Sequence, residues 1–182
     1  MRRWLAALLV LAACTADDSS TVRGRGMTVA PLSPAEQAHV YEAAARAAFD
    51  VDNPALSLMV DARLLPQAKG LSPSGSLTDA VVAELRRRGA VKGTCEPPLQ
   101  GIRGTAQCKS SLPGYVLRFS PVFSLGVDST QVYLYAQKYD TPSSGISETL
   151  RFERAYQVVR RDDGWKAVRE GQVPREVRGE KK

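Results

Sequence analysis

Few side chains in this chain of 182 residues have the chemistry of a catalytic or metal centre. The sequence contains one histidine, His39, and three cysteines, Cys14, Cys95 and Cys108. A zinc site normally takes four cysteine, histidine or carboxylate ligands, and a hydrolase needs a nucleophile beside a base. No Gly-x-Ser-x-Gly motif, phosphate-binding glycine loop or dinucleotide fingerprint is present. We therefore expect no metal and no cofactor, and the sequence favours a protein that is not an enzyme.

Cys14 closes a segment that has the layout of a secretory signal. Residues 1–3 are basic at two positions, residues 4–11 are apolar, and two alanines precede the cysteine. The sequence Leu11-Ala12-Ala13-Cys14 resembles the lipobox of bacterial lipoproteins. The resemblance implies that residues 1–13 are a cleaved signal peptide and that the thiol of Cys14 carries a diacylglyceryl group. The membrane, reached through this lipid, is then the first expected partner.

The segment after the leader agrees with an exported, lipid-anchored protein. The apolar run itself is too short to span a bilayer, because a membrane helix takes about 20 apolar residues. An aspartate in place of Thr15 would resemble an inner-membrane retention signal, so the outer membrane facing the periplasm is favoured in a bacterium with two membranes. Residues 14–32 are polar and aperiodic, which indicates a lipidated flexible tether. The net charge of +6 is mild. We expect no nucleic-acid partner, because an exported protein does not meet nucleic acid inside the cell.

The other two cysteines, Cys95 and Cys108, are expected to form one disulfide. An oxidising compartment favours this pairing, and free thiols or a metal site are the alternatives. The residues between them include two prolines and two glycines, which predicts a stapled surface loop. A disulfide that closes a loop of this size would stabilise the fold by about 3 kcal/mol.

A first helix is predicted after the tether. Ser33 and Glu36 have the spacing of a capping box, and Pro34 suits the first helical position, so the helix begins there and runs to about Asp50. His39 is expected on its solvated face. The same face is expected to include Glu42 and Arg46, and the buried stripe to include Tyr41, Ala44, Ala45 and Ala48, joined by Val40, Ala47 and Val51.

A second helix is predicted from about residue 76 or 78, and it ends with three consecutive arginines. Arg86, Arg87 and Arg88 form the only dense basic cluster after the leader and are a candidate contact for lipid head groups or another anion. The alternative is a structural one, because cations stabilise the negative end of a helix dipole and favour solubility. Gly89 then suits the left-handed stop of the helix.

The remaining periodicity is that of strands. Residues 56–62 alternate as a strand with one buried face, and extended segments follow at 115–120, 131–139, 149–161 and 165–173. Consecutive strands with short turns make an antiparallel meander. We expect an α+β fold, in which an N-terminal helix and a second short helix pack on a curved antiparallel meander of about four to five strands. This single domain would span residues 33–173, before a basic flexible tail at 174–182.

Three tyrosines on one face of the strand at 131–139 form a candidate ligand or partner surface. Val132, Leu134 and Ala136 occupy the opposite face. Aromatic rings with polar tips are common in small-molecule clefts and protein interfaces. The alternative is cross-strand packing on a half-covered sheet. The three candidate residues are Tyr133, Tyr135 and Tyr139.

The segment from Tyr156 to Val168 contains the turn Asp162-Asp163-Gly164 between two strands. It resembles the closing hairpin of the nuclear transport factor two superfamily, over about the last third of the chain. The resemblance implies a strongly curved sheet that forms a cone with a pocket, and cystatin-like sheets share the pattern. No acid–histidine pair matches the enzymes of that superfamily, so the resemblance supplies no site residues.

The sequence therefore predicts a membrane-anchored bacterial lipoprotein with a non-enzymatic binding or structural domain in the cell envelope. Another envelope protein is a further candidate partner. The alternative is a cone-shaped α+β domain that binds a small molecule, with or without catalysis, in a pocket inside the sheet. Such a pocket would contain a buried carboxylate. Asp61 with Glu153 is one carboxylate pair that the fold could bring together, although nothing in the sequence places them.

Overall fold

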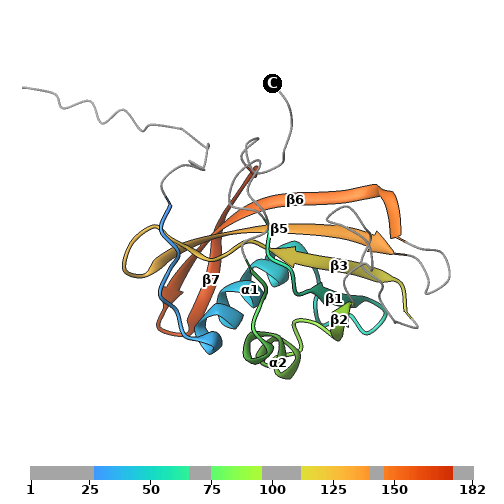
Figure 1. Cartoon of the computed structure of the whole chain (residues 1–182), viewed down its shortest axis with the longest axis horizontal. Coiled ribbons are helices and arrows are strands. Elements are labelled where there is room, and N and C mark those ends of the chain that lie inside the picture. Colours follow the sequence, from blue (N-terminus) through green and yellow to red (C-terminus); the bar gives the residue numbers. More distant parts are fainter. Residues whose placement is uncertain (1–26, 66–74, 96–111, 140–145, 174–182) are drawn as a thin grey trace, which may run out of the picture.

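The computed structural model describes residues 27–65, 75–95, 112–139 and 146–173. In these residues, two helices pack against one curved sheet of seven strands, so the α+β class is confirmed (Figure 1). The predicted signal peptide, the part of the predicted tether before residue 27 and the predicted tail at 174–182 lie outside the described residues. Within the described part of the chain, no helix is long and apolar enough to cross a bilayer.

The first helix, α1, spans Pro34–Ala48 and begins with the predicted capping box. The Ser33 hydroxyl accepts from the Glu36 amide at 3.3 Å, and the Glu36 carboxylate accepts from the Ser33 amide at 3.1 Å. The prediction for the two faces of α1 is partly wrong, because Ala47 is exposed and Glu42 is buried. The reason is that α1 packs against both the sheet and the second helix, so its buried surface is wider than a single stripe.

The second helix, α2, spans Asp79–Arg87, and Thr78 caps its N-terminus. Val81, Val82 and Leu85 are buried, as the sequence predicts. Gly89 has a φ of +75°, the left-handed conformation that a glycine adopts readily after a helix. The helix therefore ends where its arginines and glycine indicate.

The strands run in the order β2-β1-β3-β5-β6-β7 across the sheet, and β4 pairs with β5 beside this path. From β3 onward, the pairings β3–β5, β4–β5, β5–β6 and β6–β7 are antiparallel, as the meander predicts. The strands are β1 (Ser57–Asp61), β2 (Gly93–Cys95), β3 (Gly114–Phe119), β4 (Phe123–Ser124), β5 (Ser129–Tyr139), β6 (Ile146–Arg161) and β7 (Gly164–Gly171).

The prediction of a wholly antiparallel sheet of four to five strands is wrong at one end. Strand β1 pairs in parallel with both β2 and β3, and the described sheet has seven strands. All five residues of β1 are buried, whereas one buried face was expected. The helix α2 connects β1 to β2, which is the crossover that parallel neighbours require. Close pairing also requires a glycine, since a Cβ at Gly114 would lie 1.7 Å from the Ser57 carbonyl oxygen.

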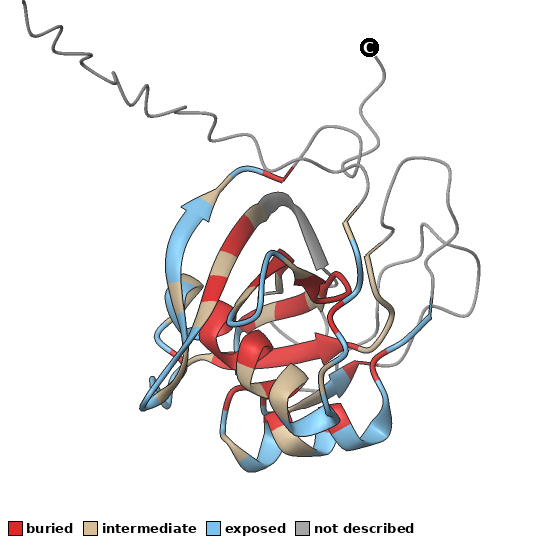
Figure 2. Cartoon of the chain, turned by 90° about the vertical axis from the view of Figure 1, so that its left-hand side faces the viewer, coloured by how far each residue is buried: buried red, intermediate tan, exposed pale blue. Residues whose placement is uncertain are grey.

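Side chains pack on both faces of the sheet. The main core lies between the sheet and the helices, and a second cluster lies on the face that turns away from the helices. Figure 2 shows buried residues along the central strands and exposed residues on the outer sides of the helices. The main core includes Tyr41, Leu58, Val60, Leu85, Leu117, Phe119, Val132, Leu134, Ala136, Tyr156 and Val158. The second cluster contains Phe123, Tyr133, Ala155 and Val173, with Met27 and Leu65 packed against it.

Candidate functional site

A row of polar residues crosses the sheet on the face opposite the helices. Arg118 on β3 lies beside Tyr135 on β5, and Tyr135 lies beside Glu153 on β6. Asp61 at the end of β1 completes the row through its ion pair with Arg118. We call these four residues the polar band. Residues directly opposite each other in a sheet share a face, so the band borders the second cluster, which also lies on this face.

Asp61 is the most deeply buried charge of the polar band, with a side chain that is 2% exposed. Arg63, two residues after it, donates to both carboxylate oxygens, with Nη2 2.6 Å from Oδ2 and Nε 3.0 Å from Oδ1. The Arg63 amide also donates to Oδ1 at 3.0 Å. Arg118 donates to Oδ2 through Nε at 3.1 Å and through Nη2. A carboxylate has about four lone-pair sites, so these bonds occupy the acceptor capacity of Asp61.

The electrostatics keep Asp61 ionised. Burial raises the pKa of its carboxyl group, but the hydrogen bonds from Arg63 and the charge of Arg118 lower it more, so the pKa lies below its usual value. A general base at neutral pH needs a pKa near 7 and an open acceptor site. Asp61 has neither, and its arrangement is that of a structural ion cluster.

Asp61 and Glu153 do not form a carboxylate pair. They lie on β1 and β6, with Arg118 and Tyr135 between them. Three strand spacings separate them, which is about 14 Å. The two acids of a glycosidase lie within about 10 Å of each other. The fold therefore brings the two residues to one face but not to one reaction centre.

The three tyrosines of the predicted ligand or partner surface differ in their surroundings. Tyr133 is 1% exposed and packs on Phe123, with ring centroids 5.6 Å apart, so it belongs to the second cluster and not to an open surface. Tyr135 is partly buried in the polar band, and its hydroxyl donates to Gln137 Oε1 at 3.2 Å. The side chain of Tyr139 lies outside the described residues. The alternative of cross-strand packing therefore describes Tyr133.

The three arginines of the predicted anion contact also differ in their contacts. Arg87 forms an ion pair with Glu84 of its own helix, and Arg88 reaches across to Glu42 of α1. Arg86 is exposed on α2. The carboxylate of Glu42 is 10% exposed and also accepts from Arg46 at 2.9 Å. Arg88 is thus a link between the two helices, and an anion would have to compete with Glu42 and Glu84 for two of the three arginines.

Of the remaining predicted residues, His39 lies apart from the polar band, Cys95 lies beside it, and Cys14 and Cys108 are not described. His39 is partly buried on α1, and the described residues contain no group of three potential metal ligands. Cys95 ends β2 beside Asp61 and is 3% exposed. Cys14 and Cys108 lie outside the described residues, so the lipid and the disulfide with Cys108 stay predictions.

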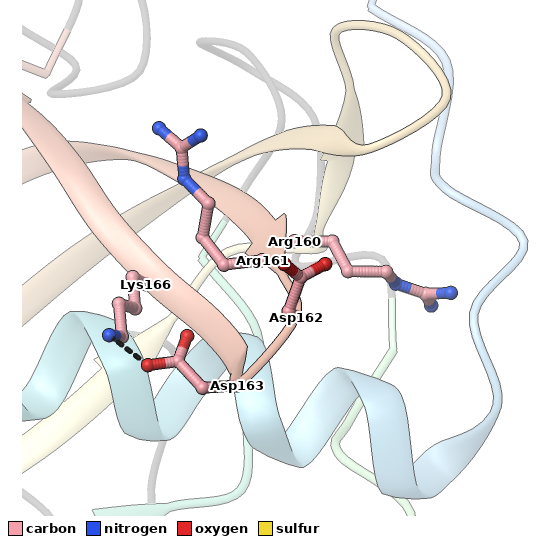
Figure 3. Close-up of a pocket in the computed structure, with 5 residues that line it drawn as sticks. All are labelled: Arg160, Arg161, Asp162, Asp163 and Lys166. Carbon is pink, nitrogen blue, oxygen red and sulfur yellow. Dashed lines mark hydrogen bonds and ion pairs between the residues drawn. The ribbon is translucent and has the colours of Figure 1, made fainter.

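A shallow open hollow lies at the turn between β6 and β7 (Figure 3). Arg160 forms an ion pair with Glu36 of α1. The guanidinium carbon of Arg160 also lies over the Trp165 ring, 4.9 Å from its centroid. Lys166 points toward Asp163 and forms an ion pair with it, whereas Arg160 and Arg161 point away from each other. Opposite charges therefore neutralise much of this surface. Its lining residues are Arg160, Arg161, Asp162, Asp163 and Lys166.

Sequence reasoning missed the pairing of Asp61 with Arg118 and Arg63. A signal was available, because Asp61 and Arg118 are each the only charged residue in a mostly apolar strand, and buried charges require partners. No family model matches the chain, and neither a curated protein nor a solved structure shows significant similarity to it. The lipobox resemblance and the hairpin resemblance thus rest on the residues quoted for them.

Proposed function

We propose that this protein is a membrane-anchored bacterial lipoprotein of the cell envelope. The support is the order of residues in the leader: two arginines, an apolar run, two alanines and then Cys14. A lipid on Cys14 attaches the chain to the membrane, and a second acyl chain makes the attachment stable. In a bacterium with two membranes, the outer membrane facing the periplasm is the favoured location.

The tether limits how far the domain stands from the membrane. Twelve residues separate Cys14 from Met27, and a chain of this length spans at most about 45 Å when fully extended. Met27 packs against the second cluster, so the tether joins the domain at the sheet face opposite the helices. The lipid therefore holds this side of the domain within tens of ångströms of the bilayer.

We propose further that the domain binds a partner or has a structural role without catalysis. The observation that carries this proposal is that α1 fills the inner side of the curved sheet (Figure 1). Tyr41, Ala44 and Ala45 of α1 are at most 1% exposed, and the Tyr41 ring packs on Phe119 with centroids 4.6 Å apart. A pocket inside the sheet would need the volume that these side chains occupy. Another envelope protein is the candidate partner.

A small-molecule-binding domain is the second candidate, and one observation favours it. Asp61 is a buried carboxylate, and buried charged groups often mark binding sites. Two arginines already neutralise it. An anionic ligand in this region would therefore have to draw one arginine away from Asp61, and a cationic ligand would have to displace one.

Fractionation of cells tests the anchor. The full chain and its Cys14→Ala variant would be produced in a bacterium that exports lipoproteins. We expect the wild-type chain in the membrane fraction and the variant outside it, because the lipid is the only attachment proposed to be strong enough alone. A variant that stays in the membrane fraction to the same extent would contradict the anchor.

Thermal unfolding of the purified protein with a panel of metabolites tests the role of the domain. A ligand at 100 times its Kd stabilises a protein by about 2.7 kcal/mol, which raises the Tm by several degrees. A domain that binds a partner protein or has a structural role should show no such shift with a metabolite. A metabolite that raises the Tm by several degrees would instead support the small-molecule-binding domain.

A further inference from the structure

Three exposed apolar side chains gather at one end of the sheet. Val29, Leu125 and Val127 have exposed fractions of 48%, 47% and 96%. They make up three of the five large exposed hydrophobic residues in the described part of the chain. We call these three residues the apolar tip. Single exposed apolar residues are common on protein surfaces, but several at one projecting turn indicate a contact.

Backbone hydrogen bonds bring the apolar tip together. Leu125 and Val127 lie in the turn between β4 and β5, which the Leu125 amide closes by donating to the Ser129 carbonyl at 2.9 Å. Val29 pairs with Phe123 at the start of β4, and the Ser124 amide donates to the Thr28 carbonyl at 2.8 Å. Figure 1 shows the segment from residue 27 running beside this projecting turn.

The apolar tip is fixed to the body of the domain. Phe123, at the base of the turn, is buried in the second cluster. The Arg160 amide donates to the Asp128 carbonyl at 2.9 Å, which ties the turn to β6. Val127 therefore projects from an ordered turn, and burying it elsewhere costs little conformational entropy.

The proposed lipid anchor joins the chain at the same place. Met27, the first described residue, is two positions before Val29, and the tether from Cys14 spans at most about 45 Å. A lipid at Cys14 would keep the apolar tip at a high local concentration beside the bilayer. The tip is thus the apolar surface that lies nearest along the chain to the membrane.

The charges around the apolar tip are balanced. Arg160, Arg161 and Lys166 line the neighbouring hollow together with Asp162 and Asp163, and Asp128 lies in the turn itself. These three cations face three acids, and Glu36 of α1 also pairs with Arg160, so these side chains offer no net attraction for anionic head groups. A contact at this tip would therefore depend on apolar burial, and salt would weaken it little.

We propose that the apolar tip inserts into the interfacial region of the bilayer and makes a second membrane contact that sets the orientation of the domain. This inference rests on the proposed anchor, because the tip alone offers too little apolar area for stable attachment. With the lipid in place, the two contacts together restrict how the domain can turn about its tether.

Tryptophan fluorescence in vesicles with brominated acyl chains tests the contact. The full lipidated chain would be purified as Val127→Trp and, as the matched control, Leu112→Trp. Leu112 is also exposed, but it lies before Gly114, at the opposite end of β3 and β5 from the tip. Trp165 is common to both variants, so wild-type emission gives the background. Both substitutions are at exposed positions, and unfolding midpoints would establish that both variants fold.

We expect the emission of Val127→Trp to shift to the blue and to be quenched roughly twofold more than that of Leu112→Trp, with no loss of quenching in 1 M salt, where the Debye length is about 3 Å. Equal quenching of the two variants in vesicles that carry the protein would overturn the second contact and leave the anchor intact. A blue shift without quenching, which indicates a protein contact, or quenching that salt removes, would also overturn it. A wild-type chain that does not float with vesicles would instead overturn the anchor, and the inference with it.

Discussion

Arg118 on β3 donates two hydrogen bonds to a single oxygen of Asp61 on β1, the Oδ2 atom. The two residues lie on parallel neighbouring strands and are 57 positions apart in the sequence. Arg63 binds the same carboxylate from the segment that follows β1. The buried charge of Asp61 thus joins β1 and β3 to the segment that follows β1.

Replacement of Asp61 by asparagine should destabilise the fold strongly. The variant keeps the size of the side chain but leaves two arginines without their counterion. Removing one partner of a buried ion pair costs 3–5 kcal/mol in general. Because Arg63 and Arg118 are 21% and 25% exposed, we expect the lower end, about 3 kcal/mol, measured as a shift in the urea midpoint.

Asp163→Asn is the matched control for this prediction. Asp163 also forms an ion pair, with Lys166, but both side chains are more than half exposed. Solvent screens such a pair, so the same substitution should change the unfolding midpoint little. Equal losses in the two variants would show that the ion pairs of Asp61 contribute no more to stability than an exposed ion pair does.

The Asp61 cluster should also make stability depend on acid pH. The pKa of Asp61 is lower in the folded protein than in the unfolded chain, so the unfolded chain takes up a proton first as the pH falls. The stabilisation is then complete above the unfolded pKa of about 4 and is lost as the pH drops through the lower folded pKa. We expect the stability difference between wild type and Asp61→Asn to be constant at roughly pH 5–7 and to shrink below about pH 4. A stability difference that grows toward acid pH would contradict the assigned direction of the Asp61 pKa shift.

The link between the helices can be tested with two neighbouring arginines. Arg88→Ala removes the bond to Glu42, whose buried carboxylate would keep only Arg46, and should cost about 2 kcal/mol. Arg86→Ala, on the exposed side of the same turn, removes a similar side chain and should cost little. Urea unfolding of both variants measures the difference. If Arg86→Ala were the more destabilised variant, the assigned role of Arg88 would be wrong.

Two buried tyrosines should respond in opposite ways to the loss of a hydroxyl group. Burial, with the charge of Glu170, raises the pKa of Tyr156 to about 12, and its hydroxyl has no hydrogen-bond partner in the described structure. Tyr156→Phe should therefore leave stability unchanged or raise it. The Tyr41 hydroxyl donates to the Ser120 carbonyl at 3.1 Å, so Tyr41→Phe should cost about 1–2 kcal/mol. Thermal unfolding decides the order, and a larger loss in Tyr156→Phe would imply a partner for that hydroxyl.

The parts of the fold that local patterns determine could be predicted from the sequence. The capping box of α1 depends on residues three positions apart, and the two faces of β5 follow from its alternation. The parallel pairing of β1 could not be predicted, because β2 has three residues and its partner lies beyond a whole helix. Nothing local distinguishes such a segment from a loop.

The candidate site was harder to predict for the same reason. Asp61 and Arg118 meet only when β1 and β3 pair in one register, which depends on contacts far apart in the sequence. Tyr133 lies on the face that its alternation predicts, but Met27, Leu65 and Val173 cover it from three distant segments. Periodicity identifies the two faces of a strand, whereas the burial of each face depends on what the rest of the chain places over it.

The mass of the mature N-terminal peptide tests the central claim most directly. The full chain would be produced in a bacterium that processes lipoproteins, extracted with detergent and digested. The account predicts a first peptide that begins at Cys14 and carries a diacylglyceryl group, with no peptide from residues 1–13. An unmodified Cys14, in a chain that keeps its leader or is cut elsewhere, would contradict the lipid anchor.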